Sequence, residues 1–103
     1  MSRRILVEPE AEAELQAAAE WYEAQGAGLG FELLAQAQAA YQRIADGEHG
    51  THVPGVQTGA RRMPVSPFPL WIVFIERSGT VVIVAYAHER RRPGYWSTRI
   101  RES

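Results

Sequence analysis

The 103-residue chain is long enough for one domain with a single modest core, and 46% of its residues are hydrophobic. It contains no cysteine and no lysine, which excludes disulfides, thiolate nucleophiles, cysteine metal sites and lysine chemistry. Because no apolar run is long enough to span a bilayer, we expect a cytoplasmic protein without membrane contact, and nothing in the sequence implies a metal or a cofactor.

The net charge of −1 hides an uneven distribution of charged residues. Residues 1–50 carry three arginines and nine acidic residues, whereas residues 51–103 carry eight arginines and three acidic residues. The acidic half and the basic half are therefore expected to face different partners. Arginine presents a planar fork of donors that suits phosphate and carboxylate groups, but it is a poor general base near neutral pH.

A short strand is predicted for residues 3–7, followed by a helix. Pro9 suits the first turn of a helix, and the acidic residues after it favour the positive end of the helix dipole. With Gly26 as a stop, this helix is expected to run from about residue 9 to 25. Its glutamates are interpreted as a solvated face that stabilises the helix. They are Glu10, Glu12, Glu14, Glu20 and Glu23.

A tight turn is predicted for GAGLG, residues 26–30, because a phosphate-binding loop would follow a strand and here a helix comes first. A second helix is predicted for about residues 28–46, and the two helices should form an antiparallel hairpin. The apolar stripe of the second helix is expected to consist of Phe31, Leu34, Tyr41 and Ile44.

A glycine-rich segment without periodicity, residues 47–60, predicts a loop in which His49 and His52 are exposed and bind no metal. Three strands are then predicted, at residues 60–66, 68–77 and 80–89. The pair Ser78 and Gly79 predicts a hairpin between the last two. The whole chain, residues 1–103, is thus expected to be one α+β domain: an N-terminal strand and a helical hairpin on a three- to four-stranded antiparallel sheet.

The stretch AYAHERRRPGYWSTR, residues 85–99, is the main candidate for function, since it combines a histidine, four arginines and three aromatic residues. Arg61 and Arg62 open one predicted strand, and His88 and residues 90–92 follow the end of another. If those strands are neighbours, both groups meet at one edge of the sheet. Such a concentration of cations favours an anionic partner, which is RNA, DNA or an acidic protein segment; the alternative is a solvated chain end.

Two interpretations remain open for His88 and for the tail aromatics. His88 would be a general base or acid in RNA cleavage, or it would form a local hydrogen bond that shapes the turn into the tail, and we favour the second. Tyr95 and Trp96 would stack on bases, or they would fold the tail back over the sheet. Hydrolases have little support, because no Gly-x-Ser-x-Gly motif and no pair of carboxylates occurs in the β-rich half.

Several motifs occur together in a defined order. They are WYE (21–23), GLGFE (28–32), RRMPVSPFPLWIVF (61–74), VVIVAYAHERRRPGYW (81–96) and Arg99. This combination covers almost the whole chain and resembles the RelE/ParE superfamily of toxins from bacterial toxin–antitoxin operons. It is most similar to the ParE-like, plasmid-stabilisation branch.

The resemblance implies a helical hairpin on an antiparallel sheet and a cognate antitoxin whose C-terminal segment wraps the toxin. It implies contact with operator DNA only through that antitoxin. ParE-like members poison DNA gyrase, whereas RelE-like members cut mRNA on the ribosome with lysine, arginine and tyrosine. Because this chain has no lysine, and Tyr95 stands beside Trp96 outside a clear catalytic pattern, the resemblance favours a gyrase poison that is not an enzyme.

The residues carried over from the resemblance are expected to contact the target or the antitoxin. They are Arg61, Arg62, His88, Arg90, Arg91, Pro93, Trp96 and Arg99. If the chain were instead a ribosome-dependent nuclease, the catalytic residues would be His88, Arg61, Arg62 and Arg91. A third interpretation is a non-toxic relic that binds its antitoxin and co-represses the operon.

Overall fold

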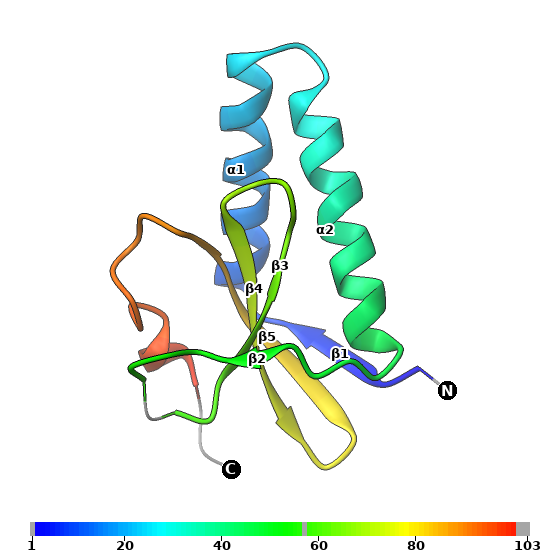
Figure 1. The fold of residues 1–103 in the computed structure, drawn as a ribbon, viewed down its shortest axis with the longest axis vertical. Helices are drawn as coiled ribbons and strands as arrows, with labels where there is room; N and C mark the ends of the chain where they lie inside the picture. Colours follow the sequence, from blue (N-terminus) through cyan, green and yellow to red (C-terminus); the bar gives the residue numbers. More distant parts are fainter. Residues whose placement is uncertain (1, 57, 101–103) are drawn as a thin grey trace.

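A computed structural model describes residues 2–56 and 58–100, and Figure 1 shows its course. In chain order, the elements are β1 (Arg4–Val7), α1 (Pro9–Gln25), α2 (Leu29–Ala45), β2 (Thr51–His52), β3 (Arg61–Pro64), β4 (Leu70–Arg77), β5 (Thr80–His88) and a short 3-10 helix, η1 (Ser97–Arg99). The α+β class and the helical hairpin are confirmed, and both helices begin and end within one residue of their predicted bounds. No helix in the described ranges is both long and apolar enough to cross a membrane.

The strands form one five-stranded sheet in the order β1-β5-β4-β3-β2. From β5 to β2 all neighbours are antiparallel, as predicted, whereas β1 lies parallel to β5 at the sheet edge. A parallel neighbour requires a long crossover connection, which begins with the helical hairpin. The segment predicted to be a loop contains β2, whose two residues pair with the start of β3.

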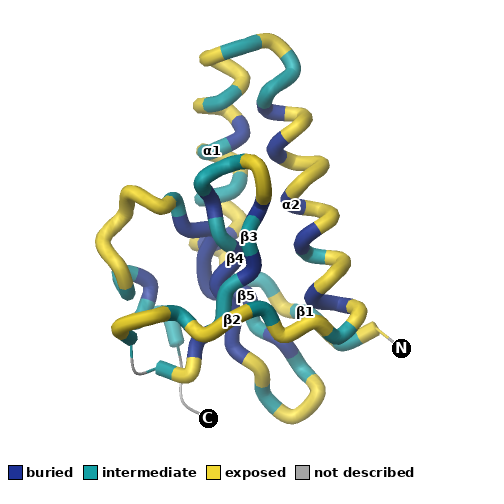
Figure 2. Tube along the Cα trace, in the orientation of Figure 1, coloured by how far each residue is buried: buried dark blue, intermediate teal, exposed yellow. Residues whose placement is uncertain are grey.

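The two faces of the sheet are covered by different parts of the chain (Figure 1). The helices cover one face, where Leu33, Phe74 and Ile83 are fully buried. The other face holds a second core that contains Val84 and Trp96, and the C-terminal tail closes it. We call these the helix face and the tail face. Figure 2 shows that the buried positions of both helices lie along their facing sides, while the connecting turn carries only exposed and half-buried residues.

The helices approach each other closely near the turn that joins them. A Cβ atom on Gly30 would lie 2.7 Å from the carbonyl oxygen of Ala19, so the contact requires glycine. The Glu23 carboxylate accepts the backbone N–H groups of Gly28 and Gly30, each at 2.9 Å, and these bonds lower the pKa of Glu23. The predicted turn is confirmed, and Glu23 is a cap for the start of α2 as well as a solvated side chain.

The predicted apolar stripe of α2 is wrong at two positions. Phe31 is 78% exposed and Leu34 is 37% exposed. The residues of α2 that are buried are Gly30, Leu33, Ala37, Ala40, Ile44 and Ala45. This stripe consists mainly of small residues because close contact between two helices leaves little room for side chains. Two large apolar side chains near the free end of the hairpin therefore remain in water, Phe31 and Trp21 of α1.

The ladder between β4 and β5 contains a β-bulge. Val73 pairs with Ala85 and Phe74 pairs with Ile83, so Val84 has no partner on β4. A bulge changes the phase of the side chains along a strand. As a result, Val84 and Ala85 both pack in the core of the tail face.

Candidate functional site

The two arginines that open β3 have different surroundings. Successive side chains of a strand point to opposite faces, so Arg61 and Arg62 diverge. The guanidinium carbon of Arg62 lies 3.9 Å from the centroid of the Trp71 ring. Arg61 donates from Nε to the His49 carbonyl at 2.5 Å, and its Nη1 lies 3.0 Å from Nε2 of His52. The two arginines were expected to belong to one basic cluster, but the structure places them in different surroundings.

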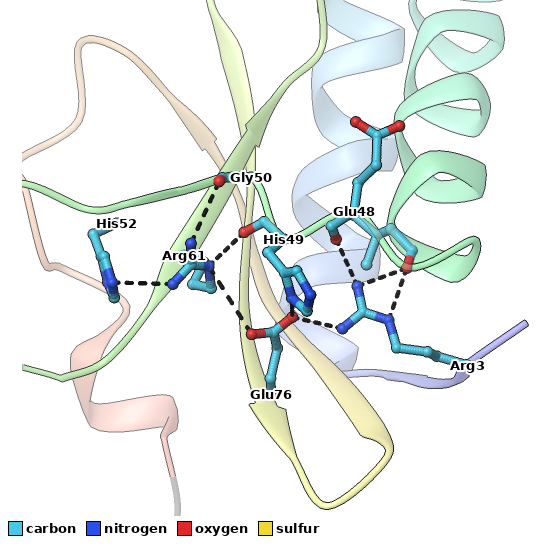
Figure 3. A network of polar contacts seen from close by, with 8 residues as sticks. Arg3, Glu48, His49, Gly50, His52, Arg61 and Glu76 are labelled. Carbon is cyan, nitrogen blue, oxygen red and sulfur yellow. Dashed lines mark hydrogen bonds and ion pairs between the residues drawn. The ribbon is translucent and has the colours of Figure 1, made fainter.

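Arg61 belongs to a polar network around the Glu76 carboxylate (Figure 3). Glu76 accepts a hydrogen bond from Arg3 Nη1 at 2.5 Å, contacts His49 Nδ1 and lies 4.0 Å from Arg61 Nε. Burial raises the pKa of Glu76, but the bonds from Arg3 and His49 outweigh this effect, so the pKa lies below its usual value. The network fastens the segment after α2 to the sheet. Within residues 2–56 and 58–100, no group of three or more histidine and acidic side chains is placed to hold a metal ion.

On the tail face, four basic residues line one concavity of about 200 Å³: Arg62, His88, Arg91 and Arg92. We call it the arginine pocket and define it by Arg62, Trp71, His88, Arg91, Arg92, Tyr95 and Trp96. The two basic groups were expected to meet because their strands would be neighbours in the sheet. This was wrong, because β4 separates β3 from β5. Instead the two groups meet because the tail folds back over the tail face, opposite Arg62.

Two of the three guanidinium groups that line the pocket, those of Arg62 and Arg91, lie over aromatic rings. Arg91 lies over Tyr95, with 3.9 Å between its guanidinium carbon and the ring centroid. The Nε atom of Arg62 is buried and has no hydrogen-bond partner among residues 2–56 and 58–100. Among the described residues, neither of these arginines nor Arg92 forms an ion pair, although Glu89 also lines the pocket.

His88 is held by its own backbone turn. Its Nδ1 accepts the backbone N–H of Arg90 at 3.1 Å, so a neutral ring carries its proton on Nε2. The in-plane lone pair on Nδ1 is thereby occupied. The ring can still donate a hydrogen bond from Nε2, but it has no free nitrogen lone pair that could act as a base. This bond is the local contact expected if the histidine shapes the turn into the tail.

The tail is clamped to α1 by Glu14. Its carboxylate accepts hydrogen bonds from the backbone N–H of Tyr86 (3.1 Å), the Tyr95 hydroxyl (2.6 Å) and the Nη1 and Nη2 atoms of the Arg99 guanidinium (2.9 and 3.1 Å). The bond to Glu14 raises the pKa of Arg99, while burial and then Glu14 raise the pKa of Tyr95. Arg99 is thus part of the scaffold, with a side chain only 17% exposed.

Glu14 is the residue that sequence reasoning missed, since it was assigned to a solvated face. Its position in the helix could have indicated this role. Glu14 follows Ala11 by three residues and precedes Ala18 by four, so it lies on the same side of α1 as these buried and half-buried residues. The tail aromatics follow the second interpretation given to them: Trp96 is 2% exposed and packs in the core of the tail face.

A second concavity of about 340 Å³ adjoins the arginine pocket and shares His88, Arg91 and Tyr95 with it. We call it the α1–tail groove. It is lined on one side by Ala17, Ala18, Trp21 and Tyr22 of α1 and on the other by the tail, which includes Arg90. Of the residues expected to contact partners, Pro93 lines the arginine pocket, whereas Arg61 and Arg99 lie in neither cavity.

Comparisons with known proteins identify the fold. No protein-family model matches the chain, and no curated protein matches it in sequence. A solved structure described as a chromosomal ParDE TA system from P. aeruginosa is similar, with a TM-score of 0.62 and 16% sequence identity over 84% of this chain and 96% of that chain. The resemblance to ParE-like toxins inferred from the sequence is thereby confirmed at the level of the fold.

Proposed function

We propose that this protein is the toxin of a type II toxin–antitoxin system, that it acts in the cytoplasm by poisoning DNA gyrase, and that a directly bound antitoxin neutralises it. The observation that carries the proposal is the fold shared with the ParDE structure over 84% of the chain. At 16% identity this likeness gives the architecture, so the target and the partner are inferred from the surface of the molecule.

The free end of the helical hairpin supports an antitoxin partner. Phe31 and Leu34 are 78% and 37% exposed, whereas the exposed Trp21 lies on the side of α1 that lines the α1–tail groove. Phe31 and Leu34 also line a shallow concavity of about 220 Å³ between the two helices. Large apolar groups in water are unfavourable, and an amphipathic helix laid along the hairpin would cover them. Antitoxin binding is therefore assigned to this surface.

The basic residues of the tail face support contact with a protein. We assign direct contact to Arg62, Arg90 and Arg91, whose side chains form no ion pair with the described part of the chain. We assign Arg61 and Arg99 to the scaffold, because each is bonded to other parts of the fold. Trp96 acts indirectly by fixing the tail, and His88 by shaping its first turn.

A ribosome-dependent ribonuclease is the second candidate, and one observation favours it: His88, Arg62 and Arg91 line the same pocket. Cleavage by a 2′-hydroxyl needs a base and an acid in addition to cations. However, the lone pair of His88 accepts a backbone N–H, and the Tyr95 hydroxyl donates to Glu14. The pocket thus offers cations without a free base, which favours binding over cleavage.

The test is a gyrase supercoiling and cleavage assay with the purified protein, run beside an RNA cleavage assay on programmed ribosomes. We expect gyrase cleavage complexes and intact RNA, with activity lost in Arg91→Glu and kept in Arg77→Glu, an arginine at the far end of β4. Gyrase that stays unaffected at every ratio would refute the target. RNA cleavage lost in His88→Ala would establish the nuclease, and unimpaired growth on expression of folded protein would indicate a relic.

A further inference from the structure

We propose that the arginine pocket is a receptor for one carboxylate, supplied by an aspartate or glutamate side chain in an acidic and partly apolar segment of a partner protein. The inference rests on the proposed function, in which the protein acts by binding another protein. It adds the chemistry of the segment that is recognised and the place where its charge is received.

Two guanidinium groups of the pocket are stacked on aromatic rings. Arg62 on Trp71 and Arg91 on Tyr95 each have 3.9 Å between guanidinium carbon and ring centroid. Stacking covers a face of a guanidinium and leaves the N–H groups at its edge free to bind an anion in the plane. These side chains are therefore ordered before any ligand arrives, which lowers the entropy cost of binding.

The pocket also contains an unsatisfied hydrogen-bond donor, on Arg62. The Nε atom of Arg62 is buried without a hydrogen-bond partner in the described part of the chain, which is unfavourable for a charged group. Arg91 and Arg92 line the same pocket, and the neutral His88 ring has its donor at Nε2. A carboxylate in the pocket would supply acceptors to several of these donors. Charge-assisted bonds of this kind are about twice as strong as neutral ones.

The walls of the pocket are partly apolar. Besides its cations, the pocket is lined by apolar groups that include Val53, Val73 and Trp96. Its volume of about 200 Å³ suits the end of one acidic side chain. The α1–tail groove next to it is lined by Ala17, Ala18 and Trp21, so an apolar neighbour of the acidic residue would enter that groove. The two cavities together fit a segment that alternates acidic and apolar residues.

A nucleic acid fits this surface less well. A phosphate backbone is a row of charges and requires a matching row of cations. Here Glu14 of α1 lines the groove and Glu89 lines the arginine pocket, so the cations do not form a continuous row. The chain as a whole has a net charge of −1, which does not attract a polyanion. The charge distribution therefore favours an acidic peptide.

The experiment is an NMR titration of the full-length protein with a short peptide that alternates leucine and glutamate, observed at the arginine Nε–H resonances. The same peptide with glutamine in place of glutamate is the matched ligand control. We expect saturable shifts at Arg62 and Arg91 with the first peptide and none with the second. Arg62→Lys keeps the charge but loses the planar fork, and should weaken binding roughly tenfold. Arg77→Lys, remote from the pocket, should bind like the unmodified protein.

Three outcomes would overturn the inference: no saturable shift at Arg62 and Arg91, equal binding of the glutamine peptide, or equal affinity in Arg62→Lys and Arg77→Lys. Shifts produced by an oligouridine probe and not by the glutamate peptide would identify a nucleic-acid site instead. The proposed function fails separately, because it is measured on gyrase. A pocket that binds the peptide in a protein that leaves gyrase untouched would uphold the receptor and refute the target.

Discussion

The Glu14 clamp gives the sharpest prediction about stability. In Glu14→Ala, the Arg99 guanidinium loses its carboxylate, and the Tyr95 hydroxyl and the Tyr86 N–H lose their acceptor. The tail is then held by the apolar contacts of Trp96 and by the bond from Arg99 to the Val84 carbonyl. We therefore expect a less stable protein with a loosened tail.

The size of the effect follows from the burial of the pair. Removing one partner of a buried ion pair costs about 3–5 kcal/mol of unfolding free energy. The side chains of Arg99 and Glu14 are 17% and 16% exposed, so water can reach part of the orphaned charge. We therefore expect a loss of about 2–3 kcal/mol, because some of the penalty is relieved by hydration. In a domain of this size, this corresponds to a melting temperature lower by roughly 10–15 °C.

The assay is thermal and urea denaturation followed by circular dichroism. Glu20→Ala is the matched control, since it removes an exposed glutamate from the same helix and should change the unfolding free energy by less than about 0.5 kcal/mol. Glu14→Gln, which keeps one acceptor, should lie between the two. A Glu14→Ala protein as stable as Glu20→Ala would show that the clamp contributes nothing, and the reasoning from its four hydrogen bonds would be wrong.

Four further substitutions test other parts of the fold. Gly30→Ala forces a Cβ to within 2.7 Å of the Ala19 carbonyl oxygen and should cost about 1–3 kcal/mol in urea denaturation; unchanged stability would show that the helices can separate freely. Phe31→Ser should leave stability within about 0.5 kcal/mol, whereas the fully buried Leu33→Ala should cost about 2–4 kcal/mol, and a reversed order would restore the stripe inferred from sequence. Glu76 has a pKa below 4.5 in the folded protein, so its stabilisation is present above pH 4.5 and is lost as the pH falls through the folded-state pKa. Glu76→Gln should therefore flatten the acid limb of the stability curve, and an unaltered limb would exclude this carboxylate as its source.

Local signals in the sequence were sufficient to locate both helices and four of the five strands, all but β2. Pro9 and Gly26 mark the ends of α1, and the Ser78–Gly79 pair marks the hairpin, with positive φ at both residues. These signals involve residues that are close in the chain, where backbone sterics decide the outcome. The direction of β1 relative to β5 depends on the path of the intervening chain, and no local pattern encodes it.

The candidate site was only partly predictable, because its contacts join distant residues. Alternation along a strand places Arg61 and Arg62 on opposite faces, but it does not tell which face the tail will cover. Glu14 and Arg99 are separated by 85 positions, and only the folded chain brings them together. Phe31 was misplaced for a related reason: hydrophobicity alone ranks it above the small residues that close helix contact actually selects.

The bulge in β5 has a consequence for the order in which the molecule folds. Arg99 Nη1 donates to the carbonyl of Val84, the residue without a partner on β4, at 3.1 Å. That carbonyl reaches its position only when β4 and β5 have paired around the bulge. We therefore expect the tail to dock after the sheet has formed, with its contacts absent from the transition state for folding. Loss of the Arg99 or Trp96 side chain should accelerate unfolding while the folding rate stays the same.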